Sequence, residues 1–212
     1  MKNIRSILLA IALSAVAVEG FSQGFVNLDF EDAVVPNRYT LLANPAEIFP
    51  GWTVTAPFAC YDEISLSGAS ASIFDTNAPY FMLPIQGNYF AMLLGPGTAT
   101  VTVSLSQTGQ IPLSAKSITF WGDIEGMAVT FNGQPLSFAV QNTTANYNIY
   151  GADISAYAGQ SGQLTFSETQ YGTGKLDNIQ FSSTAVPEPS SFALGILGGT
   201  LLVFTRKKSN RP

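Results

Sequence analysis

Histidine is absent from the 212-residue sequence, and cysteine occurs only once, at Cys60. Without histidine the chain cannot build a Ser-His-Asp or Cys-His catalytic unit, and it lacks the commonest zinc ligand. A single cysteine cannot form a disulfide within the chain. Charged residues make up only 11% of the sequence, and acidic residues outnumber basic ones by 14 to 9. Because nucleic-acid binding depends on basic side chains that neutralise phosphates, this balance argues against a nucleic-acid partner.

The first 23 residues are organised like a secretory signal peptide. A basic start, Met1–Arg5, precedes an uncharged apolar run at 7–18 that contains small residues near its end. The run is too short to span a bilayer, which takes about 20 apolar residues. We therefore expect residues 1–23 to be removed during export, with the cut between Ala17 and Gln23. A buried N-terminal helix is the alternative.

The other terminus, residues 186–212, repeats this organisation in reverse. It starts with a stiff, helix-breaking motif, since each proline fixes its own φ and restricts the residue before it. An uncharged apolar segment follows, and a basic tail then favours the cytoplasmic side of a membrane. The motif is Val186, Pro187, Glu188 and Pro189; the segment is Phe192, Ala193, Leu194, Gly195, Ile196, Leu197, Gly198, Gly199, Thr200, Leu201, Leu202, Val203 and Phe204; the tail carries Arg206, Lys207, Lys208 and Arg211.

The apolar segment suits a transient membrane helix better than a permanent anchor. Even when counted from Ser190 to Thr205, it is short for a bilayer span. Its three glycines also weaken a helix. An ordinary C-terminal membrane anchor is the alternative.

In this order, and with a signal peptide at the opposite end, the three parts of 186–212 resemble the PEP-CTERM sorting signal of Gram-negative bacteria. The resemblance implies that an exosortase, a membrane protease-transpeptidase, cuts near the motif and releases the preceding domain to the envelope or exterior. It also implies a link to exopolysaccharide and biofilm matrix. The expected partners are therefore an exosortase-type enzyme and, transiently, the inner membrane. The expected location is the cell surface or the extracellular matrix.

Residues 24–185 remain as one domain, long enough to build a full core. Three basic residues and twelve acidic ones give this part a net charge of three minus twelve, or −9. Such a charge keeps a protein soluble and away from anionic surfaces. The basic residues are Arg38, Lys116 and Lys175.

Alternating apolar residues predict an all-β domain, because period-2 alternation is typical of half-buried strands. No segment of the domain keeps a helical period for three turns. Asn132-Gly133 suits a tight hairpin, since both residues tolerate positive φ. Short strands separated by glycine and proline favour a jelly-roll β-sandwich. The expected strands are Phe25–Phe30, Thr98–Ser106, Ser117–Trp121, Ala128–Phe131, Leu136–Val140, Gln163–Ser167 and Leu176–Phe181.

Three passages of the domain resemble galactose-binding-like jelly rolls. They are Asn27–Glu31 together with Pro50–Trp52, Asp153–Gln160, where a single helical turn is expected, and Leu176–Phe181. The resemblance implies a carbohydrate-binding-like fold. In many members a structural calcium ion lies between the first and last strands.

For this chain the resemblance implies a calcium site at Glu31 and Asp177, with Asp32 as the alternative to Glu31. Backbone carbonyls would complete the six to eight oxygen ligands that calcium takes. The competing interpretation is that both carboxylates are solvated or accept hydrogen bonds from turns.

Sugar-binding modules stack an exposed aromatic ring on the apolar face of a pyranose. Trp52, which follows Pro50-Gly51, is the predicted ligand-binding residue, with a place in the core as the alternative. Trp121 ends an alternating strand and is predicted to lie in the core. Further candidates are Tyr61, Tyr80 and Tyr89.

No catalytic residue is predicted. Asp123 and Glu125 are two positions apart, about 6.6 Å on a strand. That separation lies within the range of paired glycosidase carboxylates, roughly 5–9.5 Å, but the flanking glycines favour a solvated turn. Gly172–Lys175 lacks the upstream glycine and the Ser or Thr of a phosphate loop. Cys60, in an apolar setting, is predicted to be a buried, unreactive thiol.

Together these observations predict a non-catalytic exported protein of the cell surface or extracellular matrix, with polysaccharide as the expected ligand. One alternative is a structural or adhesive matrix protein without a ligand pocket. The other is a glycan-active enzyme.

Overall fold

The computed structural model describes residues 24–35, 39–63, 69–75, 85–95, 101–124, 126–168 and 172–186. The expected signal peptide and, apart from Val186, the expected sorting signal lie outside these residues. Among the residues described, no helix is long and apolar enough to cross a membrane.

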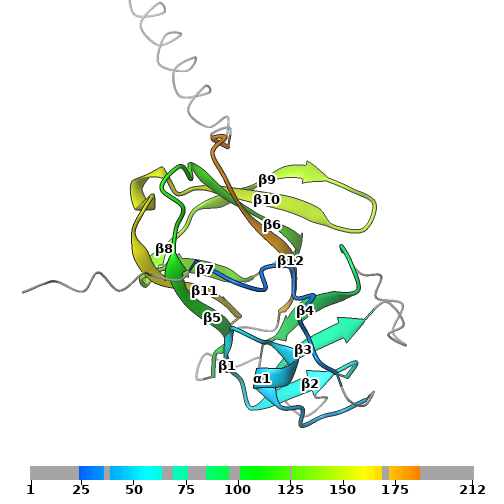
Figure 1. Cartoon of the computed structure of the whole chain (residues 1–212). Coiled ribbons are helices and arrows are strands. Elements are labelled where there is room, and N and C mark those ends of the chain that lie inside the picture. Colours follow the sequence, from blue (N-terminus) through cyan, green and yellow to red (C-terminus); the bar gives the residue numbers. More distant parts are fainter. Residues whose placement is uncertain are drawn as a thin grey trace, which may run out of the picture.

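Within the described ranges the chain forms two β-sheets that pack face to face, so the predicted all-β sandwich is confirmed (Figure 1). The five-stranded sheet has the order β1 (Thr53–Thr55), β5 (Val103–Gln110), β11 (Ser161–Glu168), β7 (Ala128–Phe131) and β8 (Gln134–Pro135). The seven-stranded sheet has the order β2 (Phe58–Tyr61), β3 (Ser70–Asp75), β4 (Tyr89–Leu94), β12 (Thr173–Ser182), β6 (Ser117–Asp123), β10 (Asn148–Asp153) and β9 (Phe138–Thr143).

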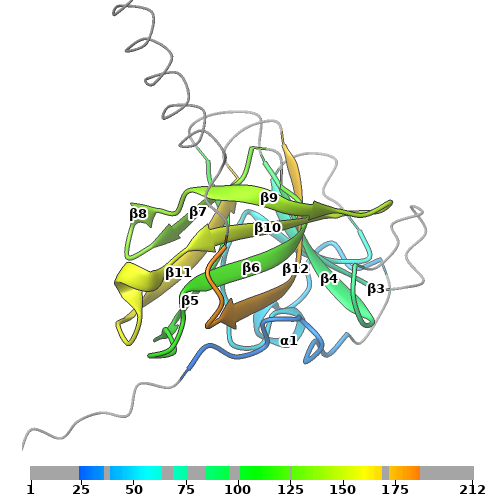
Figure 2. The ribbon, with the colours of Figure 1, turned by 90° about the horizontal axis from the view of Figure 1, so that it is seen from above.

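Most neighbouring strands are antiparallel, and β2 and β3 pair in parallel. The closing strand β12 lies inside the seven-stranded sheet, between β4 and β6. Seen from above, β9, β10, β6 and β12 lie side by side (Figure 2). The remaining described elements are α1 (Pro45–Ile48) and the 3-10 turn η1 (Ser155–Tyr157).

The core lies between the sheets and is rich in aromatic rings. Phe120 on β6 meets Phe166 on β11 edge to face, with ring centroids 5.4 Å apart. Trp52 packs against Phe166 at 6.3 Å and against Phe30 at 5.7 Å. All four side chains are buried. Each contributes about 1.5–3 kcal/mol or more through the apolar surface that it removes from water.

Two local predictions agree with the structure. Asn132 and Gly133, with φ of 49° and 74°, form the tight turn between β7 and β8. The expected helical turn is η1: Ser155 N–H donates to Asp153 Oδ1 at 2.8 Å, and Gly159 follows with φ of 76°. Tyr157, half-buried, packs its ring 5.1 Å from Phe131.

The expected strand at Phe25–Phe30 is wrong. The chain turns there, with positive φ at Asn27 (47°) and Phe30 (60°). Asn27 holds the turn, because its Oδ1 accepts from Asp32 N–H at 3.1 Å and its Nδ2 donates to the Pro50 carbonyl at 3.0 Å. The first bond closes the turn locally, and the second joins it to Pro50, 23 residues further along the chain. The alternating side chains gave no sign of either bond.

Candidate functional site

The outer face of the seven-stranded sheet carries an aromatic and charged strip along β6. Ile118 and Phe120 are buried in the core, and because strand side chains alternate, Thr119, Trp121 and Asp123 point to the opposite face. Thr119 and Trp121 are half-buried, and Asp123 is exposed.

Trp121 stacks on Tyr147, with ring centroids 5.2 Å apart and an interplanar angle of 11°. Both rings are half-buried. Tyr147 lies in the tight turn that joins β9 to β10. Thr144 closes this turn, since its N–H and Oγ1 donate to the Tyr147 carbonyl at 2.9 and 2.8 Å. The turn therefore fixes the position of the Tyr147 ring, while its partner Trp121 is held on β6. The stack is thus a preformed feature of the surface.

A charged pair lies beside the stack. Asp123 on β6 is directly opposite the half-buried Lys175 on β12 in the strand register. Gly122 permits this close approach of the two strands, because a Cβ at this position would overlap the Lys175 carbonyl oxygen. An apolar ring surface, a carboxylate acceptor and an ammonium donor thus lie within one small area of the outer face.

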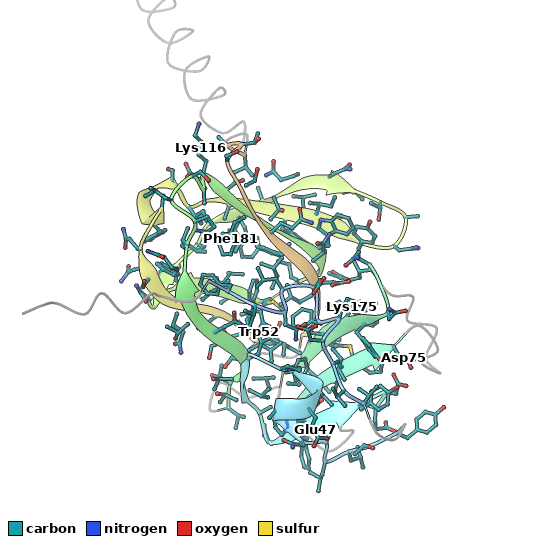
Figure 3. All side chains as sticks on the ribbon, in the orientation of Figure 1. Glu47, Trp52, Asp75, Lys116, Lys175 and Phe181 are labelled. Atoms are coloured by element: carbon teal, nitrogen blue, oxygen red, sulfur yellow. The ribbon has the colours of Figure 1, made fainter. Side chains whose placement is uncertain are left out.

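Trp52 does not belong to this surface, so the prediction that it binds a ligand is wrong. Its side chain is only 6% exposed, between Phe30 and Phe166, and Figure 3 shows it inside the sandwich. Its indole N–H donates to the Asn27 carbonyl at 2.9 Å. The opposite prediction for Trp121, placement in the core, is also wrong, since that ring lies on the outer face.

Two of the three tyrosine candidates, Tyr61 and Tyr89, lie within the described residues. Tyr61 is buried and donates its hydroxyl to Asp75 Oδ2 at 2.9 Å. Tyr89 is half-buried at the start of β4, and Tyr80 lies outside the described residues. Tyr147, which the sequence did not single out, became recognisable only when the β9–β10 turn brought it to Trp121.

Next to Trp121 in the register, Asp177 of β12 is fully buried. Its Oδ2 accepts from Gln86 N–H at 2.8 Å, and its Oδ1 accepts from Asn178 N–H at 2.6 Å. Burial is the main cause that raises the pKa of Asp177 to about 8; the negative charges of Glu31 and Asp29 contribute to the rise, and the two hydrogen bonds oppose it.

Glu31 binds the segment that leads into β4. Its Oε1 accepts from the N–H groups of Asn88 and Tyr89 at 2.7 and 2.9 Å, and its Oε2 accepts from Asn88 Nδ2 at 2.9 Å. Glu31 and Asp177 together therefore attach residues 86–89 to the turn after Asn27 and to β12.

The predicted approach of Glu31 to Asp177 is consistent with this arrangement, because the charge of Glu31 acts on the pKa of Asp177. A buried carboxyl beside two other acidic groups is an environment that a bound cation would relieve. Within the described ranges, however, no group of three or more His, Cys, Asp or Glu side chains could hold a metal. Any calcium ion would thus depend on backbone carbonyls for most of its shell, and the calcium site stays a prediction.

The described residues show no catalytic or phosphate-binding geometry for the remaining candidates. Asp123 ends β6, but Glu125 lies outside the described residues, so their pairing has no described geometry. Thr173–Lys175 belongs to β12 and forms no phosphate-binding loop. The Cys60 thiol is buried, as predicted, and donates to the Leu41 carbonyl at 3.4 Å.

No family model matches the sequence, and no curated protein matches it either. Two solved structures are similar in fold. The enzymatically active domain of tailspike protein 4 from bacteriophage CBA120 has 13% identity and a TM-score of 0.37, over 63% of this chain and 19% of that one. TmCBM61, solved with β-1,4-galactotriose, has 16% identity and a TM-score of 0.42, over 76% of this chain and 99% of that one. At such scores, these likenesses carry no argument about the ligand of this chain.

Proposed function

We propose that this protein is a non-catalytic, exported polysaccharide-binding protein and that the Trp121–Tyr147 stack is its binding surface. The observation that carries the proposal is this pair of parallel, half-buried rings on an outer sheet face. Aromatic rings of this size normally bury most of their area in a core. A preformed stack at the surface offers a flat apolar area that suits the apolar face of a sugar ring.

The polar groups beside the stack support the same ligand class. The Asp123 carboxylate accepts hydrogen bonds and the Lys175 ammonium donates them, which matches the mixed donors and acceptors of sugar hydroxyls.

Export and sorting form the second half of the proposal. We propose that residues 1–23 act as a signal peptide, and that 186–212 act as a PEP-CTERM-type signal cut by an exosortase-type enzyme. The end of the fold supports this division. Lys116 N–H donates to the Ser182 carbonyl at 2.7 Å, and Ser117 Oγ donates to the Thr184 carbonyl at 2.7 Å. These two hydrogen bonds, at the end of β12, lie just before the Pro-Glu-Pro motif begins.

Affinity electrophoresis against hydroxyethyl cellulose, β-1,4-galactan and dextran tests the binding half. At least one polymer should retard the protein, and Trp121→Ala and Tyr147→Ala should each weaken that retardation about tenfold or more, equivalent to about 1.4 kcal/mol. Tyr39→Ala is the matched control, because this ring is 54% exposed but lies outside the stack.

Two results would refute the binding half. If both stack variants are retarded as strongly as the wild type, the stack is not the binding site. If no polymer retards the wild type, a structural or adhesive matrix protein is favoured. A hydrolase screen on the same polymers separates the enzymatic alternative, since product release would contradict a non-catalytic role.

Mass spectrometry of the protein from envelope and culture-medium fractions tests the sorting half, since it reads both ends of the mature chain. Replacing Pro187, Glu188 and Pro189 with alanine should leave an unprocessed, membrane-retained form. Normal release of that variant would refute sorting through this motif.

A further inference from the structure

We infer that the Trp121–Tyr147 surface selects glycan chains that carry no carboxylate or sulfate groups. This inference rests on the proposed function and specifies the ligand class of the same site. It follows from the distribution of charge over the domain.

The domain has few cations to offer an anionic ligand. Residues 24–185 carry three basic and twelve acidic side chains. Within the part of the chain that the structure describes, the basic residues are Lys116 and Lys175, and Arg38 lies outside that part. A polyanion approaching this domain therefore meets net repulsion, which lowers both the rate and the strength of association.

The local charges at the stack lead to the same conclusion. Lys175 is the described cation near Trp121, and the Asp123 carboxylate lies opposite it in the strand register, so any anion attracted by Lys175 also approaches a negative charge. Lys116 lies just before the start of β6, and Figure 3 shows it well apart from Lys175. A carboxylate or sulfate placed on the stack would therefore experience repulsion from Asp123 together with attraction to Lys175.

Uncharged sugars face no such cost. Their hydroxyls can donate to the Asp123 carboxylate and accept from the Lys175 ammonium, while the ring lies on the aromatic surface. The arrangement thus combines attraction for one ligand class with repulsion of another, which is how binding sites commonly gain specificity.

The test compares each neutral polymer that binds with its carboxymethylated form, for example hydroxyethyl cellulose with carboxymethyl cellulose. At about 50 mM salt the carboxymethylated form should bind at least tenfold more weakly. This difference in affinity should decrease as the salt concentration rises to about 1 M. The Debye length then falls from over about 10 Å to about 3 Å, so the repulsion between the protein and the polymer charges is screened.

Two acid-to-amide variants separate the local charge from the net charge. Asp123→Asn should reduce the difference in affinity between the neutral and the carboxymethylated polymer. Asp153→Asn changes the net charge equally, but Asp153 lies opposite Ser117, at the other end of β6 and roughly 20 Å from Asp123 at 3.3–3.4 Å per residue. It should have little effect, and an equal effect of both variants would overturn the assignment of selectivity to this site.

The outcomes distinguish the inference from the proposed function. Carboxymethylated polymer that binds as tightly as the neutral one, and loses binding on Lys175→Gln, would overturn the inference but leave glycan binding at the stack intact. Absence of binding to either form would overturn both.

Discussion

The two tryptophans of this protein occupy opposite environments. Trp52 fills the interior between the sheets, where its indole N–H meets a backbone carbonyl. Trp121 lies on the outer face of the seven-stranded sheet, stacked on Tyr147 and next to charged groups. The local sequence predicted a core position for Trp121 and left Trp52 open between ligand binding and the core. The comparison teaches that a tryptophan's role depends on which sheet face its strand turns outward, and on what a distant loop places against it.

Trp52→Ala should have the largest effect on the stability of the fold. Removing this buried ring should lower the free energy of unfolding by about 3–5 kcal/mol, through lost burial and the cavity left behind. Urea denaturation followed by circular dichroism measures this change. A loss below about 1 kcal/mol would contradict the assignment of Trp52 to the core.

A second effect concerns Asp177, the buried acid beside Trp121. Its folded pKa of about 8 lies above the ordinary aspartate value of 3.8, so the folded state holds the proton more tightly than the unfolded state. The stability that this group contributes is therefore fully present below about pH 4 and is lost as the pH rises through about 8. At about 1.4 kcal/mol per pKa unit, the loss amounts to a few kcal/mol.

Urea titrations at pH 5, 6.5 and 8, in the presence of chelator, test this prediction. Wild type should lose stability across the series, while Asp177→Asn should lose clearly less, because the amide does not titrate. Equal slopes for both proteins would show that Asp177 is not the group responsible.

Calcium should have an intermediate effect on thermal stability, through Glu31 and Asp177. Addition of calcium near pH 7.5 should raise the Tm by several degrees, and chelator should reverse the rise, because a ligand that binds only the folded state stabilises it. Glu31→Gln should diminish the response. An unchanged midpoint would remove the calcium site and leave Glu31 and Asp177 as hydrogen-bond acceptors for residues 86–89.

The smallest effect on stability should come from Trp121→Ala. This ring is half-buried on an outer face, so its loss should cost within about 1 kcal/mol in the same urea assay. Its importance should instead appear in glycan binding. A stability loss as large as that of Trp52→Ala would make Trp121 a structural residue and weaken the proposed site.

Four of the later strands were predicted from the sequence, whereas β8 and β10 were not and β9 was predicted with shifted bounds, at Leu136–Val140. β7 coincides with its predicted range, and β6, β11 and β12 contain theirs, because one face of each strand is apolar and the other more polar. β3 and β4 were missed because both of their faces are buried. On β3, Ile73 faces the core, while Phe74 stacks on Phe90 of β4 in a separate cluster. A strand buried on both sides shows no alternation for periodicity to detect.

The candidate site could be predicted only in parts. The pattern around Asp177 marked a closing strand, and similarity to jelly rolls suggested that Glu31 lies nearby. Nothing in the sequence connected Tyr147 to Trp121, since that contact depends on the register between β6 and β10 and on the turn closed by Thr144. Each ring alone is a common core residue, and the site exists only as the pair.

By itself, the sequence determined the all-β class and the acidic character of the domain, because strand periodicity follows from the order of the residues and charge from their types. The tertiary structure decided which tryptophan is buried, that residues 25–30 turn instead of forming a strand, and that Asp177 is enclosed among other acids. Those outcomes depend on contacts between residues far apart in the chain, and the local sequence does not predict such contacts.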